Sequence, residues 1–174
     1  FVPGDQVGLV KANADGSFAV EGPHSTGGWN WAGDFFSPWK VEISADDFVY
    51  VNDWTTNGTL LRFDQTIATN SQTLILRDDN WPNGGTANLS GPAIVGTGTN
   101  AQVWMADITY PGSTGVRRFA TAGNGSVATN DTGATIIQAG GGSDLDLYPY
   151  DVAVDRSNRI YAIQFRSTAG DPSH

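Results

Sequence analysis

The stretch PYDVAVDRSNRIYAIQ (residues 149–164) decides the fold, because two earlier stretches align on it without a gap. They are PWKVEISADDFVYVND (residues 38–53) and PAIVGTGTNAQVWMAD (residues 92–107). Each stretch opens with proline and later places an aromatic residue between aliphatic ones. The prolines are 54 residues apart (92 − 38) and then 57 residues apart (149 − 92). Such a spacing predicts an array of similar structural units.

Each unit is predicted to contain four antiparallel strands. The proline-led half alternates apolar and polar residues, as in Val41-Glu42-Ile43, and a polar turn such as residues 155–158 follows it. The aromatic residue marks a second strand that completes a hairpin. Third and fourth strands are predicted at residues 60–63 and 73–76 in one unit, at 116–119 and 135–137 in the next, and at 8–11 and 17–20 in a preceding unit.

This pattern predicts an all-β fold, with four-stranded blades of about 55 residues that form part of a β-propeller. We expect a single propeller segment over residues 1–174, in an incomplete ring of about three blades. Residues 1–37 are the predicted end of one blade, 38–91 and 92–148 two full blades, and 149–174 the first half of the next. Because a closed propeller has at least about four blades, another chain or an unseen part of the same polypeptide is expected to complete the ring.

The composition excludes several classes of function. A net charge of −9 argues against nucleic acid and anionic membranes as partners, because both need clustered lysine and arginine. The absence of cysteine excludes a disulfide scaffold and a zinc–thiolate site. A chain rich in Thr, Asn, Gly and Trp without cysteine is typical of a bacterial exported protein, either secreted or at the cell surface. The start at Phe1 indicates processing or membership of a longer polypeptide.

Residues 148–155 (YPYDVAVD), followed by NRIY at 158–161, resemble the repeats of a known family. It is the NHL and SMP-30 (gluconolactonase)-like superfamily of six-bladed β-propellers, and the resemblance covers the repeat cores, about half of the chain. In the gluconolactonase-like enzymes, carboxylate and amide side chains hold a divalent metal on the central axis. The resemblance therefore implies that acidic residues of the first strands would help to hold such a metal. Glu42 is the only acidic residue that we count in the first strands, and Gly96 and Ala153 occupy its position in the other two copies.

A ligand-binding rim is predicted where the loops into the first strands meet the loops between second and third strands. Asp53 and Asp107 occupy the same repeat position, and Gln164 stands there in the third copy. Two interpretations of this position are open. The carboxylates could cap the ends of the strands, or these side chains could form a ring of oxygen ligands for Ca²⁺. The predicted rim residues are Asp34, Asp53, Trp54, Asp107, Tyr110, Tyr148, Gln164 and Arg166.

Two further features suggest ligands. Asp144 and Asp146 follow three glycines and could form a calcium loop, although a glycine-rich turn explains the same residues. Four of the six tryptophans lie in predicted loops, where they could stack on sugars or pack beneath the loops. No catalytic residue is predicted, because the only histidines are His24 and His174 and no nucleophile-elbow motif is present.

The leading hypothesis for function is a non-enzymatic β-propeller module for interaction or assembly, within a larger exported protein. The first alternative is a calcium-dependent enzyme of the lactonase or hydrolase type. The second is a carbohydrate-binding propeller with a glycan as its partner. Because the net charge is negative, we expect no nucleic acid as a partner. Because the sequence has no long apolar run, we expect no insertion into a membrane.

Overall fold

The computed structural model describes residues 10–20, 38–53, 59–65, 73–77, 89–107, 115–122, 125–127, 133–138 and 149–164. Over these residues the protein is all-β with antiparallel strand pairs, apart from one short 3-10 helix. This confirms the fold class in its broad form. The described sheets form an open array, and none of them closes on itself.

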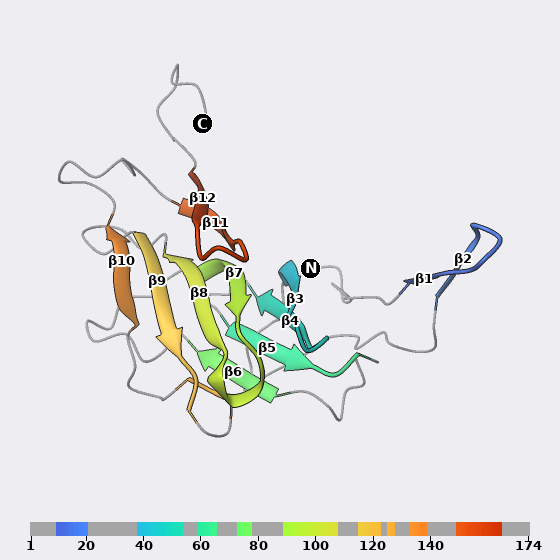
Figure 1. Cartoon of the computed structure of the whole chain (residues 1–174), viewed down its shortest axis with the longest axis horizontal. Coiled ribbons are helices and arrows are strands. Elements are labelled where there is room, and N and C mark those ends of the chain that lie inside the picture. The colour runs from blue at the N-terminus through green and yellow to red at the C-terminus, as the bar shows by residue number, and fades with distance from the viewer. Residues whose placement is uncertain are drawn as a thin grey trace, which may run out of the picture.

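Two of the sheets have four strands in simple sequential order (Figure 1). The first sheet consists of β3 (Pro38–Ile43), β4 (Val49–Asp53), β5 (Thr59–Phe63) and β6 (Thr73–Arg77). The second sheet consists of β7 (Leu89–Val95), β8 (Gln102–Asp107), β9 (Gly115–Ala120) and β10 (Ala134–Gln138). The four strands predicted for each of these units are confirmed.

Two hairpins accompany the sheets. The first hairpin pairs β1 (Val10–Ala12) with β2 (Phe18–Val20), and the last hairpin pairs β11 (Pro149–Val154) with β12 (Ile160–Gln164). The last hairpin lies against the second sheet, whereas the first hairpin stands apart from the rest in Figure 1. Both hairpins fall where the sequence predicts strands.

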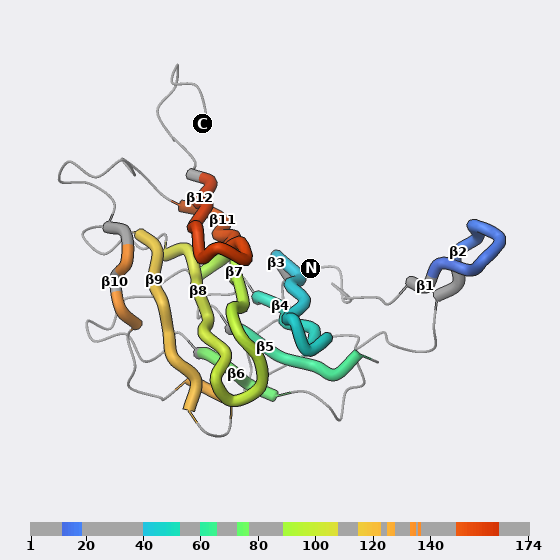
Figure 2. The backbone as a smooth tube through the Cα atoms, in the orientation of Figure 1, coloured from blue at the N-terminus to red at the C-terminus, as the bar shows by residue number. Residues whose placement is uncertain are grey.

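The first strands of successive units lie side by side. Strand β7 contacts both β3 and β11, as the backbone trace in Figure 2 shows. The sheets therefore stack face to face in chain order. Each sheet has a forward face, with Tyr50, Trp104 or Tyr161 at its second strand, and a rear face, which bears the neighbouring aliphatic residues.

Two apolar interfaces hold the stack together. At the first interface the forward face of the first sheet, with Tyr50 and Leu60, packs on Val103, Met105 and Phe119 of the second sheet. At the second interface the forward face of the second sheet packs on the last hairpin. The residues of this second cluster are Ala93, Trp104, Ala106, Val116 and Val152, with Val95, Val154, Ile160 and Ala162 beside them.

The strand register corrects the gapless alignment in the second unit. Equivalent cross-strand partners near the hairpin turn are Ile43 with Val49, Val154 with Ile160, and Ile94 with Val103 in the second sheet. Eight residues (95–102) separate the pair in the second sheet and five (155–159) separate the pair in the last hairpin, so the second unit contains three extra residues. A surface turn accepts such an insertion, which here holds the 3-10 helix Gly98–Asn100.

The same insertion displaces the predicted start of the second unit. Strand β7 begins at Leu89 rather than at Pro92, so the predicted boundary between residues 91 and 92 falls inside this strand. By register, Leu89 is the counterpart of Pro38 and Pro149, since these three residues face Asp107, Asp53 and Gln164. Ser90, which precedes the predicted boundary, is therefore a residue of β7.

Candidate functional site

Asp107 is the one predicted rim residue whose side chain the structure describes. Its carboxylate is fully buried, and Nε of Arg117 donates to Oδ2 over 2.6 Å. Arg117 lies on the adjacent strand β9 and is itself buried. A buried carboxylate joined to arginine stabilises the sheet interior, and this geometry favours the structural interpretation of the position over a solvent-facing ligand.

The other predicted residues divide into two groups. Asp53 and Gln164 end β4 and β12 at the register position of Asp107, as the repeat predicts, and the structure describes only their backbone. The remaining predicted rim and metal residues lie outside the described residues. They are Asp34, Trp54, Tyr110, Tyr148, Arg166, Asp144 and Asp146.

The first strands β3, β7 and β11 each have a β-bulge near their start. The register shifts between Pro38 and Lys40, between Ser90 and Ala93, and between Pro149 and Asp151. Bulges recur near functional sites because they re-aim side chains. Three residues of the first strands lie at or just past these bulges, namely Lys40, Ser90 and Asp151. Their register positions are equivalent, because they pair with Asn52, Ala106 and Ile163 respectively.

Lys40 connects the first sheet to the last hairpin. Its Nζ lies 2.5 Å from Oδ1 of Asp151, donates to the carbonyl oxygen of Val152 over 3.1 Å, and lies 3.9 Å from Oε2 of Glu42. The Asp151 carboxylate also accepts the backbone N–H of Val152. These half-buried charges link residues 111 positions apart and reach past the middle strand β7.

Strand β7 joins the same cluster through its backbone and Ser90. The hydroxyl of Ser90 donates to the carbonyl oxygen of Tyr150 over 2.7 Å. Next to it, Gly91 adopts a φ of +56°, and a Cβ atom there would lie 2.3 Å from Cα of Asp151. Only glycine permits this approach of β7 and β11. We call Lys40, Glu42, Ser90, Gly91 and Asp151 the inner-strand cluster.

Glu42 is a partly buried carboxylate of the inner-strand cluster. Burial raises the pKa of the Glu42 carboxyl, and the nearby Asp151 raises it further, while Lys40 acts in the opposite direction. The charged part of the cluster is one ammonium group, that of Lys40, between the carboxylates of Glu42 and Asp151. This arrangement joins the first sheet to the last hairpin. Two of its acids belong to first strands, so the expectation that Glu42 is the only acid there was wrong.

A signal for this cluster exists in the sequence. Lys40 and Asp151 are 111 residues apart, which equals the offset between Pro38 and Pro149. Opposite charges therefore occupy the same repeat position two units apart. Sequence reasoning missed this pair because it compared acids with acids and did not look for a cation at the equivalent position.

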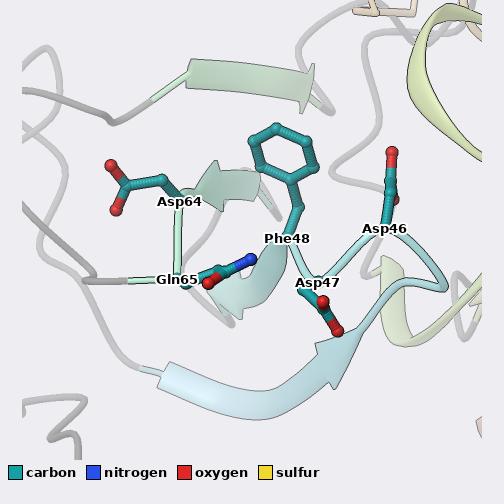
Figure 3. Close-up of a pocket in the computed structure, with 5 residues that line it drawn as sticks. All are labelled: Asp46, Asp47, Phe48, Asp64 and Gln65. Atoms are coloured by element: carbon teal, nitrogen blue, oxygen red, sulfur yellow. The ribbon is translucent and has the colours of Figure 1, made fainter.

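A shallow hollow of about 230 Å³ lies elsewhere, at the turn between β3 and β4 (Figure 3). Asp46, Asp47, Phe48, Asp64 and Gln65 line it, and the three carboxylates point in different directions. Within the described residues, no group of three or more His, Cys, Asp or Glu side chains could hold a metal ion.

Asp46 in this hollow makes contacts that connect the two sheets. Its carboxylate accepts the hydroxyl of Ser44 over 2.6 Å and the backbone N–H of Gly98 over 2.7 Å. Burial alone would raise the pKa of Asp46, but the hydrogen bonds from Ser44 and Gly98 hold it below its usual value. Asp46 thus joins the turn of the first sheet to the longer turn of the second.

No family model, curated protein or solved structure matches the chain. The described part of the chain contains no helix with the length and apolar character needed to cross a membrane.

Proposed function

We propose that the chain is a non-enzymatic module for assembly, built as a segment of a β-propeller within a larger exported protein. Three features support the propeller arrangement: sequential four-stranded sheets, face-to-face packing in chain order, and first strands that lie next to one another. The resemblance of residues 148–161 to six-bladed repeats points in the same direction.

The observation on which this proposal rests is the contrast between the interior and the ends of the stack. On the forward face, Tyr50 and Trp104 are 2% and 9% exposed, whereas their counterpart Tyr161 in the last hairpin is 51% exposed. Ile163, on the same strand, is 60% exposed. The last hairpin thus presents apolar side chains where the two preceding units make their interfaces.

The opposite end of the stack shows the same contrast in β3. Val41 and Ile43 face the rear side of the first sheet and are 46% and 63% exposed. Covering a half-exposed aliphatic side chain contributes about 1 kcal/mol, since full burial contributes roughly 1.5–3 kcal/mol. The rest of this rear face is covered, since Val51, Leu61 and Phe63 are fully buried. The exposed forward face of the last hairpin is therefore suited to receive a further sheet, and the module functions by docking there.

Hydroxyl-radical footprinting tests this function. In the native assembly, purified without denaturant, we expect Tyr161 and Ile163 to be labelled much less than in the isolated chain. Tyr50 and Met105, which are buried inside the stack, serve as controls that stay unlabelled in both samples. Equal labelling of Tyr161 and Ile163 in the two samples would overturn the proposal.

A further inference from the structure

The ammonium group of Lys40 lies among oxygen atoms from two first strands. Its Nζ is 2.5 Å from Oδ1 of Asp151 and 3.1 Å from the carbonyl oxygen of Val152, both in β11. It is 3.9 Å from Oε2 of Glu42, which lies with Lys40 in β3. Carboxylate and carbonyl oxygens are the ligands that hard cations prefer. The surroundings therefore have the chemistry of a cation site, and a side chain of the protein supplies the cation.

The side chain of Lys40 is held in this position. Only 21% of it is exposed, whereas lysine is mostly exposed in folded proteins. Strand β11 comes within reach because Gly91 in β7 permits a close approach, since a Cβ atom there would lie 2.3 Å from Cα of Asp151. The hydroxyl of Ser90 fixes the same approach by donating to the carbonyl oxygen of Tyr150. The contact is therefore built into the stack of sheets.

The repeat places opposite charges at equivalent positions. Lys40, Ser90 and Asp151 share one register position near the start of the three first strands. A calcium site built on that position would need an oxygen ligand from each unit. The first unit supplies an ammonium group instead, which attracts the Asp151 carboxylate and repels any metal ion beside it.

A divalent metal ion does not fit among these residues. The resemblance to six-bladed propellers implies such an ion, but calcium takes about six to eight oxygen ligands. The cluster offers two carboxylates and the carbonyl of Val152 around the ammonium. Oδ1 of Asp151 accepts both from Nζ of Lys40 and from the backbone N–H of Val152. A metal ion could therefore bind here only by displacing the lysine.

We infer that Lys40 is a built-in cation, whose ammonium takes the position between Asp151 and Glu42 that a free divalent metal ion would otherwise take. The inference goes beyond the proposed function, because it concerns the place where the first strands meet and not the exposed face of the last hairpin. The first sheet and the last hairpin are thus joined without a metal ion at this position. Removal of the ammonium leaves two carboxylates whose charge matches one divalent cation.

Paramagnetic broadening of amide signals by Mn²⁺ tests the inference at the residues concerned, because Mn²⁺ prefers the same oxygen ligands. In Lys40→Met we expect the backbone amide signals of Glu42 and Val152 to broaden as Mn²⁺ is added. The unmodified chain should need at least about tenfold more Mn²⁺ for the same effect, since the ammonium repels the ion. Addition of Asp151→Asn to Lys40→Met should abolish the broadening.

Further variants separate the position of the charge from its amount. Arg156→Met removes one positive charge at the exposed turn between β11 and β12, and should leave both signals as sharp as in the unmodified chain. Lys40→Arg keeps a positive charge at the cluster and should also exclude Mn²⁺. If Lys40→Met does not fold, Lys40→Gln gives the same measurement with a side chain that retains hydrogen-bond donors.

Thermal unfolding provides a second measurement. Lys40→Met should lower the midpoint by about 2–4 °C, because two partly buried carboxylates lose their cation. About 10 mM calcium should restore most of this loss, since calcium sites with few charged ligands have dissociation constants of up to about 1 mM. The same calcium should raise the midpoint of Lys40→Met by more than it raises that of the unmodified chain.

Two outcomes would overturn the inference. If Mn²⁺ broadens the signals of Glu42 and Val152 equally in the unmodified chain and in Lys40→Met, a metal ion reaches the position with the lysine in place. If neither sample shows broadening, the carboxylates do not form a cation position. Neither outcome bears on the proposed function, which footprinting of Tyr161 and Ile163 tests separately.

Discussion

Ile94 and Ile43 occupy the same register position in neighbouring sheets, yet their environments differ. Ile94 in β7 packs against the interface between the first and second sheets, whereas Ile43 in β3 is 63% exposed. The residue type and the strand register are the same, so the difference lies in what covers each strand. The preceding sheet covers Ile94, whereas the cover on the rear face of the first sheet buries Val51 and Leu61 but leaves Ile43 exposed. The comparison teaches that a repeat specifies a surface for stacking, and the neighbour decides whether that surface is buried.

The largest effect should come from the interior of the stack. Phe119→Ala removes a ring that is 1% exposed at the first interface, and we expect the free energy of unfolding to fall by about 4 kcal/mol. Ile43→Ala, at an exposed position of β3, should change it by less than about 0.5 kcal/mol. Urea unfolding of both variants checks the difference. Equal losses would mean that the rear face of β3 is covered in solution.

The buried ion pair of the second sheet should come next. Asp107→Ala leaves the buried guanidinium of Arg117 without its carboxylate, and we expect a loss of about 3 kcal/mol in the free energy of unfolding. The double variant Asp107→Leu, Arg117→Met should recover most of that loss, because no buried charge remains. A double variant as unstable as the single one would contradict this account of the pair.

The close approach of β7 and β11 can be separated from backbone strain. Gly91 and Gly98 share a φ of +56°, but a Cβ atom meets Asp151 at Gly91 and nothing within 4 Å at Gly98. Gly91→Ala should therefore cost about 2 kcal/mol more than Gly98→Ala, through overpacking. Thermal unfolding measures the difference, and amide exchange in β11 should rise only in Gly91→Ala. Equal costs would show that the strands can move apart freely.

The smallest effects concern pH, and they have opposite signs at two carboxylates. The pKa of Asp46 is lowered by folding, so its contribution to stability is present above its ordinary value of 3.8 and is lost as the pH falls through the lower folded value. The pKa of Glu42 is raised, so its protonated form favours folding below 4.5 and this contribution is lost as the pH rises through the folded value.

The matching variants are Asp46→Asn and Glu42→Gln. At neutral pH we expect Asp46→Asn to lower the midpoint of thermal unfolding slightly and Glu42→Gln to raise it slightly. Both differences should shrink in acid, that of Glu42→Gln below about pH 4.5. Melting curves between neutral and acid pH check both signs. A Glu42→Gln variant that melts lower at neutral pH would show that the contact with Lys40 outweighs the burial of the carboxylate.

Much of the fold could be predicted from the sequence because its signals are local. Alternating apolar residues, polar turns and an aromatic second strand recur in each unit, and they correctly predicted β3, β4, β5 and β6. The equivalence of Asp53, Asp107 and Gln164 was also predictable, because the second strands align without insertions.

The inner-strand cluster and the ends of the stack were decided only in three dimensions. Because of the three-residue insertion before β8, β7 begins at Leu89 rather than at the predicted Pro92, and the stacking of the sheets brought Lys40 to Asp151 across 111 residues. Sequence by itself determined the repeated unit, because strand and turn preferences act over a few residues. The tertiary structure determined which faces are covered, because burial depends on a neighbouring sheet that is far away in the chain.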